Sequence, residues 1–104
     1  MSFNLNSILS DMSDAIQKNT ADDSDSIHTY AREVMLKKKH SLEELAEARL
    51  ADEISEEEFY DEVEREKKVL QAELLTLKIM GKAMVQNAVN AAMNVFINAV
   101  KLAI

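Results

Sequence analysis

The chain contains no proline and a single glycine, Gly81, among its 104 residues. Antiparallel β-structures need these residues repeatedly, because their tight turns depend on them. Alanine, leucine, glutamate, lysine and methionine, which all favour helices, dominate the composition instead. We therefore predict an all-α protein, and its length is that of one domain, residues 1–104.

The N-terminal half shows two amphipathic patterns. Apolar residues recur every three or four positions from Leu5 to Ile16, which predicts a short helix followed by a polar loop within residues 1–22. A second helical pattern occupies residues 24–54 and is interrupted by the basic run KKKH at residues 37–40. Cations complement the dipole at a helix C-terminus, so a helix can end at this basic run. Residues 24–54 therefore form either one continuous helix or two helices.

A helical hairpin is indicated in the middle of the chain. Ser41 with Glu44, and Ser55 with Glu58, match the S-x-x-E capping box of a helix N-terminus. The segment ADEIS at residues 51–55 predicts a tight turn between two helices. The residues expected to pack across this hairpin are Leu42, Leu45, Leu50, Ile54, Phe59 and Val63.

Residues 41–70 resemble the short helical hairpin of the SHOCT type, over less than a third of the chain. The residues that carry the resemblance are Leu42, Leu45, the turn ending in Ile54-Ser55, the acidic run Glu56 to Glu58, Phe59, Lys67, Lys68 and Leu70. The sequence departs from the usual pattern at Asp52-Glu53, where the turn commonly has glycine, and it continues beyond the hairpin. The resemblance implies an oligomerisation or docking element and provides no catalytic residues.

A heptad pattern follows the hairpin. From Val63 to Leu102, mostly apolar residues recur at alternating steps of four and three, and Gly81 is the only helix breaker after Ser55. We therefore predict a long C-terminal helix over residues 55–104, either straight or bent at Gly81.

The segment 83–104 carries a single charge, Lys101. Asn87, Asn90, Asn94 and Asn98 form one stripe of the predicted helix, and this stripe is either solvated or buried. The rest of the circumference, roughly three quarters, is apolar, whereas a surface helix needs an apolar stripe only somewhat wider than about 100°.

We therefore expect copies of this helix to cover one another in an intermolecular helical bundle. The predicted oligomer interface consists of Leu77, Met84, Val85, Ala88, Val89, Ala92, Val95, Phe96 and Val100.

Several kinds of chemistry are excluded by composition and spacing. The net charge of −7 argues against a nucleic-acid partner, and the absence of cysteine excludes thiolate metal sites. His28 and His40 lack the E-x-x-H spacing of di-iron bundles. The acidic run at residues 22–26 lacks the glycine and the bidentate glutamate of a calcium loop. We predict no enzyme, no catalytic residues, no cofactor and no metal.

The leading interpretation is a non-enzymatic, cytoplasmic helical protein that self-assembles as a dimer or larger oligomer, or that acts as an adaptor for a second protein. One alternative is a secreted or filament-forming helical subunit, exported without a cleavable signal. A second alternative is a small membrane-active phage- or toxin-associated protein. Membrane contact is disfavoured because four asparagines, a glutamine and a lysine in the C-terminal segment are costly in a bilayer.

Overall fold

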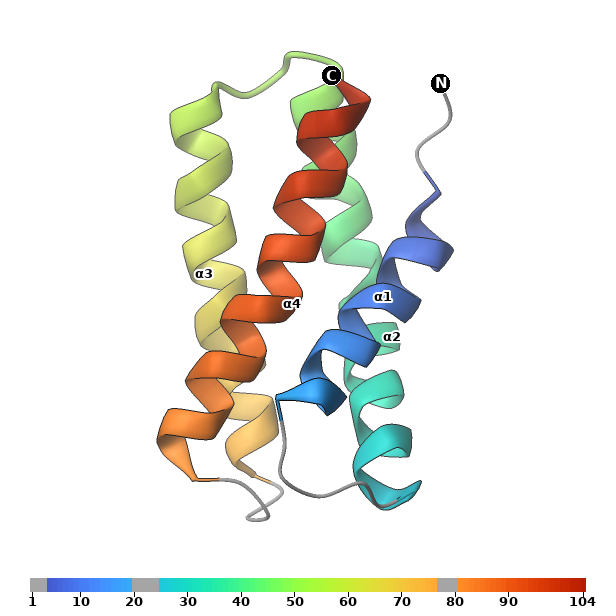
Figure 1. Cartoon of the computed structure of the whole chain (residues 1–104). Coiled ribbons are helices and arrows are strands. Elements are labelled where there is room, and N and C mark those ends of the chain that lie inside the picture. The colour runs from blue at the N-terminus through green and yellow to red at the C-terminus, as the bar shows by residue number, and fades with distance from the viewer. Residues whose placement is uncertain (1–3, 20–24, 77–80) are drawn as a thin grey trace.

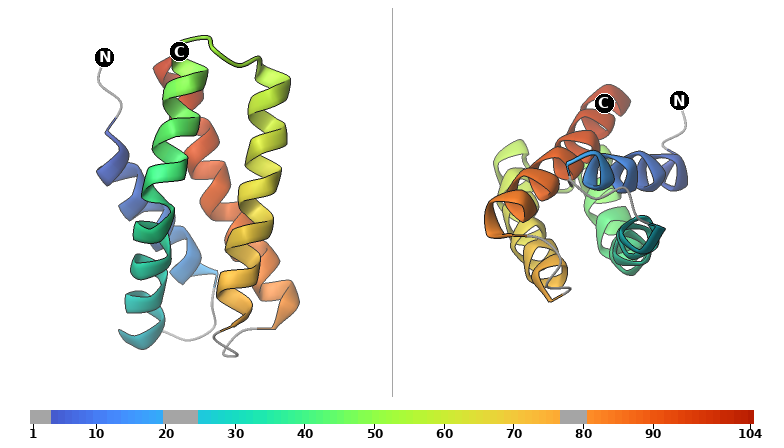
Figure 2. Two further views of the ribbon diagram at one scale, coloured as in Figure 1. Left: turned by 180° about the vertical axis from the view of Figure 1, so that it is seen from behind. Right: turned by 60° about the horizontal axis from the view of Figure 1, so that its bottom comes forward.

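The computed structural model describes residues 4–19, 25–76 and 81–104. They form four helices: α1 (Leu5–Lys18), α2 (Asp25–Leu50), α3 (Glu56–Leu75) and α4 (Lys82–Ala103). Successive helices run in opposite directions, with α1 and α4 in front of α2 and α3 in Figure 1, and Figure 2 shows the same two layers from behind. The predicted all-α bundle is confirmed, and it is formed within a single chain.

The helix α4 packs against all three other helices, α1, α2 and α3, whereas α1 and α3 do not contact each other in the described part of the chain. The largest buried side chain of α4 is Phe96, which is fully buried and stacks on the Phe59 ring of α3. The two ring centroids are 6.1 Å apart, with an interplanar angle of 23°. Residues distant in sequence therefore share one core.

The helix α2 is continuous from Asp25 to Leu50, which decides between the two alternatives for residues 24–54. The predicted capping box at Ser41 is wrong, because Ser41 lies inside the helix and its hydroxyl donates to the Lys38 carbonyl oxygen at 3.2 Å. The physical reason is burial: Leu42 continues the buried stripe that Met35 belongs to. A break at Ser41 would interrupt this packing.

The turn after α2 satisfies the last carbonyl groups of the helix. The Glu53 N–H donates to the Ala48 carbonyl at 2.8 Å, and the Asp52 N–H donates to the Arg49 carbonyl at 3.1 Å. This pair of bonds is the Schellman motif, in which the residue after the helix is left-handed. Asp52 takes that position with φ of 60°, a conformation that aspartate tolerates better than most residues. The predicted turn at residues 51–55 is therefore confirmed.

The capping box at Ser55 is also confirmed. The Glu58 N–H donates to the Ser55 hydroxyl oxygen at 3.1 Å, and the Ser55 N–H donates to the Glu58 carboxylate at 3.0 Å. The backbone bond from Ser55, followed by its hydroxyl, lowers the pKa of Glu58. Two backbone N–H groups that a helix N-terminus leaves unpaired are thus satisfied at the start of α3.

The single helix predicted over residues 55–104 is instead two antiparallel helices. Gly81 is the N-cap of α4, with φ of −72° and ψ of 162°, rather than a bend within a helix. A continuous helix of this length would extend roughly 70 Å, but the described bundle measures 39 Å along its longest axis. The heptad line does not mark the buried face of α4, since Asn98 and Leu102 on that line are exposed.

The stacked rings of Phe59 and Phe96 should be energetically coupled. We expect Phe59→Leu and Phe96→Leu each to cost about 1 kcal/mol of stability, because most of the apolar volume is kept. The double variant should lose less than the sum, by about 0.5–1.5 kcal/mol, the usual value of an aromatic pair. Urea unfolding of the four proteins measures this coupling. Strict additivity would contradict the stacking of the two rings across α3 and α4.

The capping box at Ser55 should make the stability of α3 depend on pH. Because the folded pKa of Glu58 is lowered from 4.5, its contribution is complete above the unfolded value and is lost as the pH falls through the folded value. Glu58→Gln should therefore lower the melting temperature at pH 7, and the difference from the wild type should shrink as the pH falls to about 3. Glu57→Gln, the same charge change in the same turn, should have a smaller effect. A difference that is constant with pH would refute this role.

Candidate functional site

The apolar arc of α4 lies inside the bundle of its own chain. Of the nine residues predicted to form an oligomer interface, six are at most 1 % exposed: Val85, Ala88, Val89, Ala92, Phe96 and Val100. Met84 and Val95 are partly buried against the same core, and Leu77 lies outside the described residues. The inference that another copy must cover this arc is therefore wrong, because α1, α2 and α3 cover it. Self-association itself stays a prediction.

The asparagine stripe of α4 faces solvent in the single chain. Asn87, Asn90, Asn94 and Asn98 are all exposed. One turn further, the Lys101 ammonium lies 5.5 Å from the centroid of the Tyr60 ring, which is a cation–π contact with α3. Of the two alternatives for this stripe, the structure has the solvated one.

The residues predicted to pack across the hairpin belong to the core. Leu42, Leu45, Phe59 and Val63 are buried, and Leu50 and Ile54 are partly buried against them. These six side chains pack into the core that α2, α3 and α4 share. A binding site must therefore be formed by other residues.

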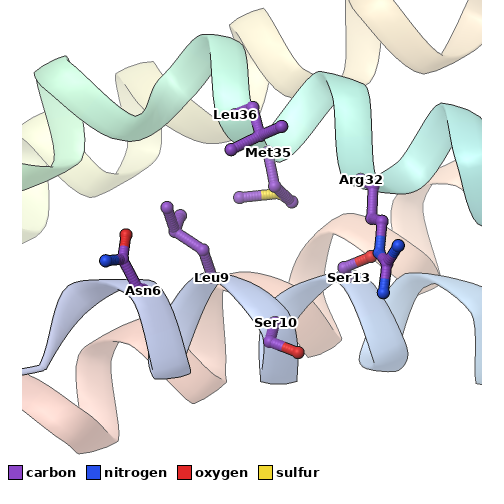
Figure 3. Close-up of a pocket in the computed structure, with 7 residues that line it drawn as sticks. All are labelled: Asn6, Leu9, Ser10, Ser13, Arg32, Met35 and Leu36. Carbon is purple, nitrogen blue, oxygen red and sulfur yellow. The ribbon is translucent and has the colours of Figure 1, made fainter.

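A cavity of about 360 Å³ opens between α1 and α2, as Figure 3 shows. It is lined by Asn6, Leu9, Ser10, Ser13, Arg32, Met35 and Leu36. The α1 residues recur every three or four positions and so share the helix face that looks toward α2. Leu9 and Met35 point toward each other across the cavity, and Arg32 extends from α2 toward α1. Ligand pockets typically measure roughly 300–1,000 Å³ and combine apolar walls with a few polar groups, as here.

Two polar groups at this cavity have no partner. Ser13 is only 3 % exposed, and its hydroxyl oxygen makes no hydrogen bond with the described residues. A buried hydroxyl left unsatisfied costs roughly 1–3 kcal/mol of stability. Arg32, in the lining of the same cavity, is exposed to solvent, and its guanidinium has no ion pair or hydrogen bond within the described part of the chain. Both groups can donate to an oxygen atom placed between the helices.

A second, more open cavity of about 400 Å³ lies on the outer surface of α2. It is lined by Leu36, Lys37, Lys39, His40 and Glu43. Leu36 borders both cavities and is 64 % exposed, which is high for a large apolar residue. We name the residues that line this second cavity the α2 surface.

The three consecutive lysines of α2 have different roles. Lys38 forms an ion pair with Glu66 of α3, and their side chains are only 14 % and 15 % exposed. Lys37 lies 3.9 Å from Glu73, but these side chains are 69 % and 40 % exposed, so water screens the pair. Lys39 forms no ion pair with the described residues and lines the outer cavity. Lys38 therefore fixes α2 against α3, and its two neighbours contribute positive charge to the α2 surface.

The histidines are engaged in local contacts. The His40 Nε2 lies 2.8 Å from a Glu44 carboxylate oxygen at the surface, and the His28 Nδ1 contacts the Gln17 side-chain oxygen, which links α2 to α1. Within residues 4–19, 25–76 and 81–104, no group of three or more histidine, cysteine, aspartate or glutamate side chains could hold a metal ion.

Comparison with models of known families, with curated proteins and with solved structures finds no match to this chain. In the described residues, no helix combines the length and the apolar character needed to cross a bilayer.

The sequence carried a signal for one of the unpartnered residues. Ser13 follows Leu9 by four residues and precedes Ile16 by three, so it occupies a position of the apolar stripe of α1. A hydroxyl at such a position indicates either a satisfied core serine or a polar group directed at a cavity. Arg32 carried no comparable signal, because its place beside Ser13 depends on how α1 crosses α2.

The ion pair between Lys38 and Glu66 should matter more for stability than its neighbour. Lys38→Met leaves Glu66 largely buried without its partner, which should cost about 2–3 kcal/mol. Lys37→Met, the same substitution at the adjacent exposed lysine, should change stability by less than about 0.5 kcal/mol. Urea unfolding at neutral pH distinguishes the two variants. Equal destabilisation would show that Lys38 does not fix α2 against α3.

Proposed function

We propose that this chain is a non-enzymatic adaptor that binds an acidic amphipathic helix of another protein on the α2 surface. The observation that carries the proposal is the position of Leu36, an exposed apolar side chain between two cavities with Lys37, Lys39 and His40 beside it. An apolar anchor surrounded by cations is complementary to a helix that presents leucine and glutamate on one face.

The charge distribution supports an acidic partner. Four of the 12 cations of the chain lie within residues 32–40, where Glu33 is the only acid, although the net charge of the whole chain is −7. Lys38 is paired with Glu66, but Lys37 and Lys39 add positive charge at the surface. A local basic surface on an acidic protein attracts acidic helices. Other copies of the acidic chain are also repelled less strongly here than at the rest of the molecular surface.

Binding is favoured over catalysis by the character of the same residues. The lining of the two cavities contains one carboxylate, Glu43, and one histidine, His40. His40 is exposed and pairs with Glu44 at the surface. Acid–base catalysis relies on titratable groups whose environments differ and exclude water. The lining of these two cavities is better suited to binding a partner than to catalysis.

Self-association is a second candidate, supported by a surface at the opposite end of the sequence. Glu56 of α3 and Ile104, next to the end of α4, line one shallow depression together with Arg49 and Lys101, and both Ile104 and Leu102 are exposed. Its one carboxylate and the exposed Ile104 match the lysines and Leu36 of the α2 surface, whereas Arg49 and Lys101, which also line the depression, oppose that contact. A contact between the two on successive copies would be heterologous and would form chains rather than closed dimers.

A designed helical peptide with leucines on one face and glutamates on its flanks tests the adaptor proposal. Fluorescence anisotropy should show binding that weakens as salt is added, because exposed charges are screened. Lys37→Glu with Lys39→Glu should weaken binding about tenfold or more, since like charges across an interface repel. Sedimentation of the protein alone reports in the same samples whether copies of the chain associate.

The matched control is Lys68→Glu with Lys82→Glu, two exposed lysines on α3 and α4 that give the same change in net charge. This variant should bind the peptide almost as well as the wild type. If it loses affinity to the same extent, or if a scrambled peptide binds equally well, the α2 surface is not a specific docking site.

A further inference from the structure

The cavity between α1 and α2 has an apolar part and a polar end. Leu9 and Met35 are buried and provide the apolar wall, and Leu36 extends it toward solvent. Ser13 and Arg32 lie at the other end, where Figure 3 shows the Arg32 side chain directed toward the α1 segment that carries Ser13. A ligand that fits this arrangement has an apolar body and one polar head.

The charge of the head group follows from the lining. Arg32 is the only charged residue among the seven that line the cavity, so a single negative charge is complementary to it. The planar guanidinium fork matches the two oxygens of a carboxylate in particular. Ser13 can donate its hydroxyl proton to one of these oxygens, which would satisfy the group that the protein itself leaves without a partner.

We propose that this cavity binds a small monocarboxylate with an unbranched apolar chain. Its carboxylate accepts hydrogen bonds from Arg32 and Ser13, and its chain lies against Leu9, Met35 and Leu36. The cavity volume of about 360 Å³ accommodates a chain of medium length.

The buried hydroxyl of Ser13 does not stabilise the fold, and we therefore assign it to hydrogen bonding with a ligand. Serine is a weaker helix former than alanine, and an unsatisfied buried hydroxyl lowers stability. Alanine at this position would lack both disadvantages. The exposed Arg32 lines the same cavity, and the Ser13 hydroxyl does not accept a hydrogen bond from it, so both groups are available to donate to one ligand.

This site is distinct from the docking site proposed on the α2 surface. Lys37 and Lys39, which carry the expected affinity for an acidic helix, do not line the cavity between α1 and α2. Leu36 alone borders both. Either site can therefore fail its test without affecting the other.

Calorimetric titration of the full chain with octanoate tests the proposal. We expect saturable binding of one octanoate, and much weaker binding of octanol, which has the same chain without the charge. Arg32→Gln should weaken octanoate binding about tenfold or more, and Ser13→Ala about tenfold, as expected for hydrogen bonds to a charged group. Without ligand, Ser13→Ala should raise the melting temperature, because it removes an unsatisfied buried hydroxyl.

Two conservative controls complete the experiment. Arg65→Gln removes an exposed arginine of α3, and Ser7→Ala removes an exposed hydroxyl of α1, and neither residue lines the cavity. Both control variants should bind octanoate like the wild type. The proposal is overturned if octanoate binding is not saturable, or if the Arg32 and Ser13 variants bind as well as the controls. It is also overturned if Ser13→Ala lowers the melting temperature, since the hydroxyl would then be satisfied within the fold.

Discussion

The apolar surface of α4 is wider than one neighbouring helix can cover, and the positions of the other helices follow from covering it. The helices α1 and α3 flank α4 without contacting each other in the described part of the chain, and α2 closes the bundle behind them. Phe96 reaches Phe59 of α3 at the centre of this contact. The remaining asparagine stripe is uncharged and faces solvent. A helix that is apolar over most of its circumference is thereby buried within a chain of 104 residues.

Because the apolar arc of α4 is covered within the chain, the proposed binding sites lie on α1 and α2. The crossing of α1 over α2 brings Ser13 and Arg32 to one cavity. Lys38 pairs with Glu66 of α3, and Lys37 and Lys39 line the outer cavity beside Leu36. Ser13, Arg32 and Lys39, which have no partner among the described residues, all belong to the proposed binding sites.

Local signals in the sequence predicted the elements well. The scarcity of glycine and proline predicted the fold class, and the capping box at Ser55 and the turn before it were found where expected. The division of residues 55–104 was not predicted, because a heptad pattern continues across Gly81 although the chain reverses there. The interface predicted on α4 failed for a related reason. Periodicity shows which face of α4 is apolar, but only the packing of α1, α2 and α3 shows that the chain itself covers that face.

The burial of α4 within one chain is the claim on which this account depends. Amide hydrogen exchange along α4, measured over a hundredfold range of protein concentration, tests it directly. The account predicts that amides from Val85 to Val100 are as well protected as the most stable amides of α2 and α3, and equally so at the lowest concentration. If α4 exchanges freely in dilute solution and becomes protected only as the concentration rises, its apolar arc is covered by other copies, and the single-chain bundle is contradicted.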